Sequence, residues 1–375
     1  MGALYIHIPF CLSKCYYCSF SSIPSAFHLY DPYIAALRKE LSELALNYPT
    51  FKLKTLFLGG GTPTVLPVEQ LSGIVRYCRE VFNEVKEAEI SIEANPGTVN
   101  LEYLDILRAA GVNRISFGVQ SFNNRELEDI GRLHDGDEAF SVLDLAIQAG
   151  FTNISLDLMY GLPGQSVDSW KYSLQKALNP GVKHLSLYQL TVEPGTVFFQ
   201  SQENSELLLP EEEDVLQMDE VTLALCEGAG LKRYEISNYA VSGYECKHNL
   251  NYWFNNEYLA AGAAAVSYMD GAREKRLQNP HQYIDYINNN SSVIVEKECL
   301  SLEASFRETV IMGLRLVEGV SRRRLYERFG IDVETYYGHT LIDLAKYGLI
   351  ELSATTLWIT DKGRPLSNYV MAELV

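Results

Sequence analysis

Residues 11–18 have the sequence CLSKCYYC and directly follow the apolar run Leu4–Ile8. The three cysteines are spaced as C-x3-C-x2-C, on what we expect to be one short loop after a strand. Three thiolates this close can bind three irons of a cubane cluster and leave the fourth iron open. A structural zinc site is the alternative, but zinc takes four ligands, and His7 on the strand is the candidate for the fourth. The spacing favours a [4Fe–4S] cluster on Cys11, Cys15 and Cys18. Aromatic neighbours are expected to limit solvent access to it: Phe10, Tyr16, Tyr17 and Phe20.

The first two thirds of the chain alternate apolar runs with amphipathic helical patterns. Strands are expected over Leu4–Ile8, Thr55–Leu58, Glu89–Glu93, Arg114–Gly118, Asn153–Met159 and His184–Leu190. Nearly continuous apolar runs are typical of parallel strands covered on both faces. Six strand–helix repeats predict an α/β fold, either a parallel barrel or a doubly wound sheet. Because ligand sites in such folds form at the carboxyl ends of the strands, we expect one active site at one rim.

Polar and glycine-rich positions follow these strands. The run GGGTP at 59–63 comes after the second strand, where glycines let the backbone approach a ligand closely. The open iron suits a small molecule that offers an amine and a carboxylate, as S-adenosylmethionine (SAM) does. Glu93 and Gln120 end the third and fourth strands and are candidates for ribose or methionyl contacts. Arg132 is a candidate for the SAM carboxylate, and Asp157, between two leucines, needs a polar partner.

The alternation of strand and helix patterns ends at about Ser301. Three helical patterns precede a hairpin pattern, IELSATTLWITDKG, and a last helix is expected near Ser367–Leu374. This order is similar to a winged-helix module. We therefore expect three parts: a barrel over 1–235, a connecting segment over 236–300 and a C-terminal helical domain over 301–375.

Charge and hydropathy exclude several functions. The 375-residue chain has a formal net charge of −17, which argues against nucleic-acid binding and favours a covering or partner-binding role for the winged-helix-like part. No apolar run of about 18 residues predicts a transmembrane helix, and the N-terminus lacks the pattern of a secretory signal. We expect a cytoplasmic protein. Its remaining cysteines are treated as core thiols or left without a role, apart from Cys246 beside His248.

The cysteine loop, GGGTP, SIEANPG, RISFGVQSFN, LDLMYGLPGQ and the C-terminal module together resemble the coproporphyrinogen III oxidase-like branch of radical SAM proteins. The resemblance covers nearly the whole chain, in the right order. It implies a partial (β/α)6 barrel with a C-terminal helical, winged-helix-like domain, a [4Fe–4S] cluster and SAM. Tyr17, between two of the cysteines, joins the SAM-binding set that it implies: Tyr5, Gly60, Gly61, Thr62, Glu93, Gln120, Arg132 and Asp157.

That branch holds an oxygen-independent coproporphyrinogen III dehydrogenase and a class of haem chaperones. The dehydrogenases carry a fourth cysteine where this chain has Phe20, and an N-terminal extension for which the position of Cys11 leaves no room. The chaperones carry an HNxxYW motif, present here as His248 to Trp253. These features favour the chaperone, with the dehydrogenase of porphyrin biosynthesis as the alternative.

The motif also has a physical argument for haem. A neutral imidazole such as His248 is a common axial ligand, and Tyr252 and Trp253 offer flat surfaces to a porphyrin. Cys246 is a weaker candidate as a thiolate ligand. The competing interpretation is that the aromatic pair packs the junction with the C-terminal domain while His248 caps a turn. We thus expect haem as a third cofactor, haem-accepting proteins, respiratory ones among them, as partners, and an electron donor for the cluster. SAM cleavage is left open.

Overall fold

The computed structural model describes residues 2–178 and 181–375. Its main feature is a 12-stranded sheet in the order β14-β13-β12-β11-β1-β4-β5-β6-β7-β8-β10-β9. The central six strands are parallel: β1 (Ala3–Ile8), β4 (Thr55–Gly60), β5 (Glu89–Ala94), β6 (Arg114–Gln120), β7 (Ile154–Tyr160) and β8 (His184–Gln189). The predicted partial (β/α)6 barrel is confirmed.

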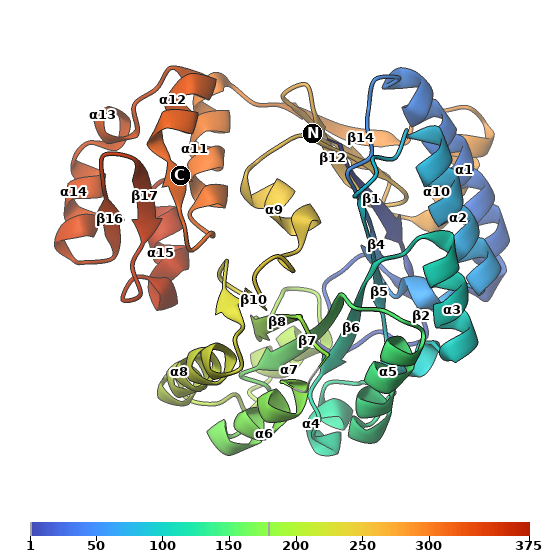
Figure 1. The fold of residues 1–375 in the computed structure, drawn as a ribbon, viewed down its shortest axis with the longest axis horizontal. Coiled ribbons are helices and arrows are strands. Elements are labelled where there is room, and N and C mark those ends of the chain that lie inside the picture. Colours follow the sequence, from blue (N-terminus) through green and yellow to red (C-terminus); the bar gives the residue numbers. More distant parts are fainter. Residues whose placement is uncertain (1, 179–180) are drawn as a thin grey trace.

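Helices cover the outer side of this curved sheet, while one short helix, α9 (Lys247–Trp253), lies on its inner side (Figure 1). The outer helices are α1 (Tyr30–Asn47), α2 (Val68–Val81), α3 (Leu101–Ala110), α5 (Gly136–Gln148), α6 (Val167–Ala177) and α8 (Glu212–Gly228). Two shorter helices, α4 (Asn124–Asp129) and α7 (Val197–Glu203), pack at the carboxyl ends of the strands beside the cysteine loop. The ends of the helices follow local rules: Asn100 accepts a hydrogen bond from the Tyr103 amide (2.8 Å) at the start of α3, and Gly111 (φ 107°) ends it.

The strands place alternate residues on opposite faces of the sheet. In β6 and β7 the apolar residues Ile115, Phe117 and Leu156 are fully buried in the main hydrophobic core. The intervening positions carry polar groups, and Ser116 donates a hydrogen bond to Asp157 (2.9 Å) across the two strands. The inside of the barrel is therefore polar although its strands look apolar in sequence.

The segment after the barrel extends the same sheet rather than only connecting two domains. It contributes β9 (Lys232–Arg233), β10 (Asn238–Ala240), β11 (Tyr258–Ala261), β12 (Val266–Met269), β13 (Ala272–Arg276), α10 (Pro280–Asn288) and β14 (Ile294–Cys299). β11 pairs with β1 in parallel, and β12 to β14 continue antiparallel. A buried ion pair between Arg276 and Glu40 fastens this extension to α1, and Glu40 also accepts from Tyr283 (2.6 Å).

The C-terminal domain has its own hydrophobic core, with Phe306, Leu325 and Leu357 at its centre. Its elements are α11 (Leu302–Gly313), β15 (Val320–Ser321), α12 (Arg322–Phe329), α13 (Val333–Tyr337), α14 (His339–Lys346), β16 (Ile350–Leu352), β17 (Thr356–Ile359) and α15 (Ser367–Ala372). The expected hairpin is β16–β17, joined by β15 into a three-stranded sheet. The third predicted helix is wrong as a single helix, because Gly338 (φ 50°) divides it into α13 and α14.

Two short strands, β2 (Phe10–Cys11) and β3 (Ile23–Pro24), pair beside the carboxyl end of β1 and frame the cysteine loop.

None of the helices in the described residues is both long enough and apolar enough to cross a bilayer.

Candidate functional site at the carboxyl rim

The three cysteines of residues 11–18 lie on one loop at the carboxyl end of β1, and all three thiols are free. Backbone hydrogen bonds hold the loop in place. The Cys18 amide donates to the Cys15 carbonyl (3.2 Å), and the Tyr16 amide donates to the carbonyl of Ile130 at the end of α4 (3.1 Å). Cys11 is buried and the other two are half-buried. All three line a cavity of about 410 Å³ at the carboxyl rim, which we call the rim cavity.

The glycine-rich turn after β4 passes close against this loop. A Cβ on Gly61 would lie 2.5 Å from the Phe10 carbonyl oxygen and 2.9 Å from the Cys11 sulfur, so a larger residue does not fit. Thr62 donates a hydrogen bond to Cys11 (3.8 Å), and Arg132 donates one to Cys15 (3.5 Å). Burial raises the pKa of the Cys11 thiol, and the Thr62 hydrogen bond and the charge of Arg132 offset part of that rise. The donor set thus fits thiolate ligands of an iron–sulfur cluster.

The thiols do not converge as they would on one ion. Within the described residues, no three His, Cys, Asp or Glu side chains come close enough together to hold a single metal ion. In a cubane each thiolate binds a different iron, so that the sulfurs lie farther apart than in a tetrahedral zinc site. The geometry therefore agrees with a cluster better than with zinc.

Two carboxylates face the rim cavity from neighbouring parts of the sheet. Glu93 on β5 accepts a hydrogen bond from the Gly60 amide (3.2 Å), and Asp157 on β7 accepts one from Ser116 (2.9 Å). Burial, and then the charge of Asp157, raise the pKa of Glu93 to about 8, and burial also raises the pKa of Asp157. A cation brought to this pair would favour the ionised carboxylates.

Arg132 is held beside the cluster loop by a chain of polar contacts. Its guanidinium donates to Asn95 (2.7 Å) and to the Gly118 carbonyl, and Asn95 donates to Thr62 (3.0 Å). Asn95 was not among the predicted site residues, although its position directly after the third strand was the available signal. Gln120, in the left-handed region (φ 67°) at a strand irregularity, also lines the cavity.

The structure brings eight of the nine predicted SAM residues to the rim cavity, since Tyr17, Gly60, Gly61, Thr62, Glu93, Gln120, Arg132 and Asp157 all line it. Tyr5 is not in the lining; its hydroxyl bonds His7 (3.0 Å) beside Phe57, inside the barrel. Met159 and Tyr188, at the ends of β7 and β8, line the cavity and were missed. The expected aromatic shield is wrong in part, because Phe20 is 66% exposed.

The HNxxYW motif lies elsewhere, at the amino ends of the strands. Its His248, on α9, is 1% exposed; Nδ1 bonds Thr55 at the start of β4 (2.9 Å) and Nε2 bonds the Tyr252 hydroxyl (2.9 Å). The ring stacks on Phe57 at 5.2 Å. Burial, followed by the charge of Arg114, lowers the pKa of His248 to about 3, so the ring is neutral at pH 7. Both ring nitrogens are engaged within the protein.

Glu89, at the start of β5, lies at the same amino end of the barrel, which α9 closes. Its carboxylate accepts hydrogen bonds from the amides of Lys247 (3.0 Å) and His248 (3.1 Å) and from the Cys246 thiol (3.6 Å). Burial raises the pKa of Cys246 to about 12, which keeps it a thiol at neutral pH. This opposes the expectation that Cys246 serves haem as a thiolate. We call the following residues the closed-end network: Thr55, Glu89, Cys246, Lys247, His248 and Tyr252.

Trp253, the last residue of α9, has a different environment. The guanidinium of Arg315 lies 4.4 Å from its ring, and the indole faces a second cavity shared with the C-terminal domain. The predicted haem residues are therefore not gathered at one site: two belong to the closed-end network, and Trp253 lies at the domain junction.

Comparisons with known proteins agree with both parts of the fold. The radical SAM superfamily model matches residues 5–177, and the HemN C-terminal domain model matches residues 300–366. The heme chaperone HemW of Bacillus subtilis is 39% identical over 371 residues, covering 99% of this chain and 98% of that protein. HemW of Escherichia coli is 36% identical, covering 87% of this chain and 89% of that protein. The structure of E. coli coproporphyrinogen III oxidase (HemN), described as a radical SAM enzyme, superimposes with a TM-score of 0.88 at 27% identity, covering 100% of this chain and 89% of that one.

Proposed function

The chain belongs to the HemW heme chaperone family of radical SAM proteins, and from this premise we propose that it binds a [4Fe–4S] cluster, SAM and haem and delivers the haem to haem-requiring proteins. The observation that carries the cluster and SAM part is the rim cavity, which is lined by three free thiols, a glycine-rich turn and a set of polar groups. Haem delivery rests on the family. The cytoplasm, respiratory haem acceptors and a separate electron donor belong to the same proposal.

The residues of the rim have distinct parts in it. Cys11, Cys15 and Cys18 hold the cluster, which with SAM supplies one-electron chemistry when both are bound. The backbone of Gly60 and Gly61 approaches the ligand without Cβ atoms.

Polar side chains position the rest of SAM. Glu93, Gln120 and Asp157 accept or donate hydrogen bonds to its polar groups, and Arg132 takes its carboxylate. Tyr17 covers one side. Tyr5 lies deeper in the barrel than these residues. It supports them through the hydrogen bond between its hydroxyl and His7.

Within the motif, Trp253 is assigned to haem, while His248 and Tyr252 position α9. The axial-ligand role expected of His248 needs Nε2, which Tyr252 occupies here (2.9 Å). His248 therefore supports haem binding through the placement of the helix that carries Trp253.

Two assays on the reconstituted protein test the proposal. A haem titration is expected to give a Soret shift that saturates at one haem per chain; no saturable shift would overturn it. Incubation with coproporphyrinogen III, SAM and a reductant is expected to yield no protoporphyrinogen IX, and formation over multiple turnovers would instead identify a dehydrogenase. HemN, assayed in parallel, is the positive control.

A further inference from the structure

A second cavity lies at the junction between α9 and the C-terminal domain, and no residue lining it lines the rim cavity. We call it the junction cavity. Its volume of about 740 Å³ falls within the range of roughly 300–1,000 Å³ that is usual for cofactor and drug sites. Aromatic and aliphatic side chains form much of its wall: Trp253, Phe254, Leu316, Val320 and Leu325.

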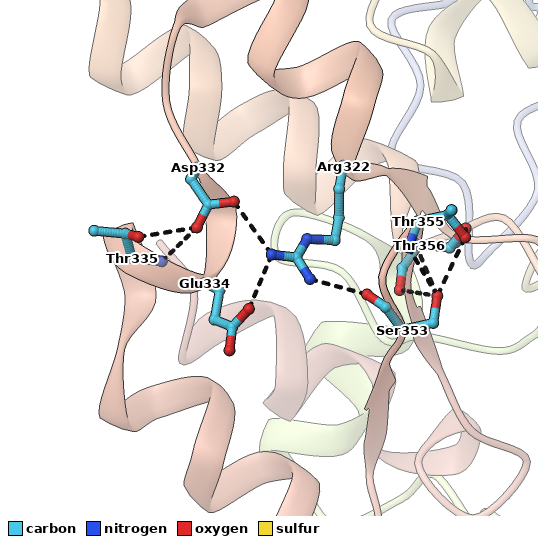
Figure 2. A network of polar contacts seen from close by, with 7 residues as sticks. All are labelled: Arg322, Asp332, Glu334, Thr335, Ser353, Thr355 and Thr356. Carbon is cyan, nitrogen blue, oxygen red and sulfur yellow. Dashed lines mark hydrogen bonds and ion pairs between the residues drawn. The ribbon is translucent and has the colours of Figure 1, made fainter.

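The charges on α12 are divided between the two sides of that helix. Arg322 pairs with Asp332 and Glu334 and donates to the Ser353 carbonyl (Figure 2). Arg323 pairs with Glu327 (2.7 Å). Both arginines thus pair with carboxylates of their own domain.

Arg324 and Arg328, in contrast, line the junction cavity. Neither has a carboxylate within ion-pair distance among the residues that the structure describes. The guanidinium of Arg324 lies 6.0 Å from the Phe254 ring, and Arg328 donates to the Asn255 carbonyl (2.9 Å), which leaves most of its N–H groups available. One carboxylate, the exposed Glu318, also lines the cavity. Arg324 and Arg328 are both exposed, so they add two unpaired cations to the solvent-facing part of this wall in a chain of net charge −17.

Trp253 adds a flat wall that is fixed in place. Arg315 stacks on one face of the ring at 4.4 Å. The indole Nε1 is buried and has no hydrogen-bond partner within the described part of the chain. Because Nε1 is buried, the indole contributes its ring and not its N–H to the cavity wall.

We propose that the junction cavity binds the tetrapyrrole, with its ring against Trp253 and Phe254 and its two propionates paired with Arg324 and Arg328. This deepens the proposed function and rests on it. None of the described lining residues is His, Cys, Met or Tyr, so the protein holds the porphyrin and its carboxylates and leaves the iron without a side-chain ligand. Such a site releases haem to a partner without breaking an iron–protein bond.

The test measures binding of three probes to the full chain by quenching of tryptophan fluorescence and by the Soret band. Haemin and metal-free protoporphyrin IX are expected to bind with dissociation constants within roughly threefold of each other, because the site does not use iron. Haemin dimethyl ester, which lacks the carboxylates, is expected to bind at least about tenfold more weakly.

Variants locate the site. Arg324→Gln/Arg328→Gln is expected to weaken haemin and protoporphyrin IX by roughly tenfold or more. The control Arg125→Gln/Arg323→Gln removes the same charge from two exposed arginines that pair with carboxylates four residues on, and is expected to bind like the wild type. Equal melting temperatures show that both variants are folded.

The outcomes separate this inference from the proposed function. Wild type that binds haemin while the cavity variant binds it equally well overturns the junction site and leaves the chaperone proposal standing. Binding of haemin but not protoporphyrin IX also overturns the inference, because it requires an iron ligand. A wild-type chain that binds neither probe overturns both.

Discussion

The two ends of the barrel are built from the same six strands, yet they use polar residues in opposite ways. At the carboxyl rim, burial and the charge of Asp157 raise the pKa of Glu93 to about 8, and polar groups line an open cavity. At the amino end, α9 fills the space, and Glu89 and His248 find their hydrogen-bond partners within the protein. The difference separates binding from support: the rim cavity has room for a ligand, whereas Glu89 and His248 at the closed end are hydrogen-bonded within the protein.

Exposure alone does not make that distinction, because buried polar groups occur at both ends. The useful criterion is whether the polar groups line a cavity or are hydrogen-bonded within the protein. Buried polar groups cost free energy unless they are hydrogen-bonded. The raised pKa of Glu93 at an open cavity therefore points to a ligand, whereas the hydrogen bonds of Glu89 and His248 within the protein point to stability.

Replacing Cys11, Cys15 and Cys18 together by serine is expected to have the largest effect. The reconstituted protein should lose the cluster's visible absorption and its bound iron entirely, because no thiolate ligand is left. The unfolding free energy of the ligand-free chain should change by no more than about 2 kcal/mol. Cys299→Ser, at an exposed thiol, is the control and should keep the full iron content. Retained iron in the triple variant would show that the rim is not the cluster site.

Glu89→Ala tests the closed end. It removes the acceptor of three hydrogen bonds and leaves the buried guanidinium of Arg114 without the charge beside it. The unfolding free energy, measured by urea denaturation, should fall by about 3–5 kcal/mol. Glu89→Gln retains part of the hydrogen bonding and should lose less. A loss below about 1 kcal/mol would contradict a network that carries stability.

Glu93→Gln at the rim should act in the opposite direction. The raised pKa of Glu93, about 8 against an ordinary 4.5, means that the folded chain binds a proton that the unfolded chain has released between these values. Stability contributed by this group is therefore lost as pH rises from about 4.5 through 8.

The glutamine variant lacks that loss. At pH 8 the ligand-free variant should be more stable than the wild type by about 1–3 kcal/mol, while it binds SAM more weakly in equilibrium dialysis. Destabilisation at pH 8 would mean that the rim carboxylates are satisfied in the same way as those of the closed end.

The titration of His248 gives the smallest effect. Its pKa is about 3 when folded and 6.5 ordinarily, so the unfolded chain binds the extra proton and the unfolding free energy falls as pH drops from about 6.5 toward 3. Between pH 6.5 and pH 5 this contribution is about 2 kcal/mol at most. Denaturation curves at pH 7.5 and pH 5 should show a smaller loss for His248→Gln than for the wild type. Equal losses would place the acid sensitivity at another group.

The parallel strands were predictable because burial on both faces forces apolar runs, and each predicted strand lies within two residues of its observed bounds. The antiparallel extension was not predicted. Its strands β13 and β14, with the sequences AREKR and IVEKEC, are mostly polar and partly exposed, so that no alternation marks them. Gly338 was visible in the sequence, but a left-handed break inside a helical pattern depends on packing.

The rim site was predictable for the same reason: residues that follow parallel strands meet at one edge, and this rule placed Glu93, Gln120 and Asp157 together. The position of His248 was not predictable. Its chemistry suits an iron ligand, and only the tertiary fold shows that Thr55, from a strand 193 residues earlier, and Tyr252 occupy its two nitrogens.

A haem titration of His248→Gln beside the wild type tests the division between the two ends most directly. Gln keeps one hydrogen bond of the imidazole and cannot serve as a strong iron ligand. If the closed end only supports α9, both proteins should bind one haem per chain with dissociation constants within about threefold of each other and with closely similar Soret maxima. A variant that melts at the wild-type temperature and still binds metal-free protoporphyrin IX but has lost haem binding would place the iron on His248 and contradict the account.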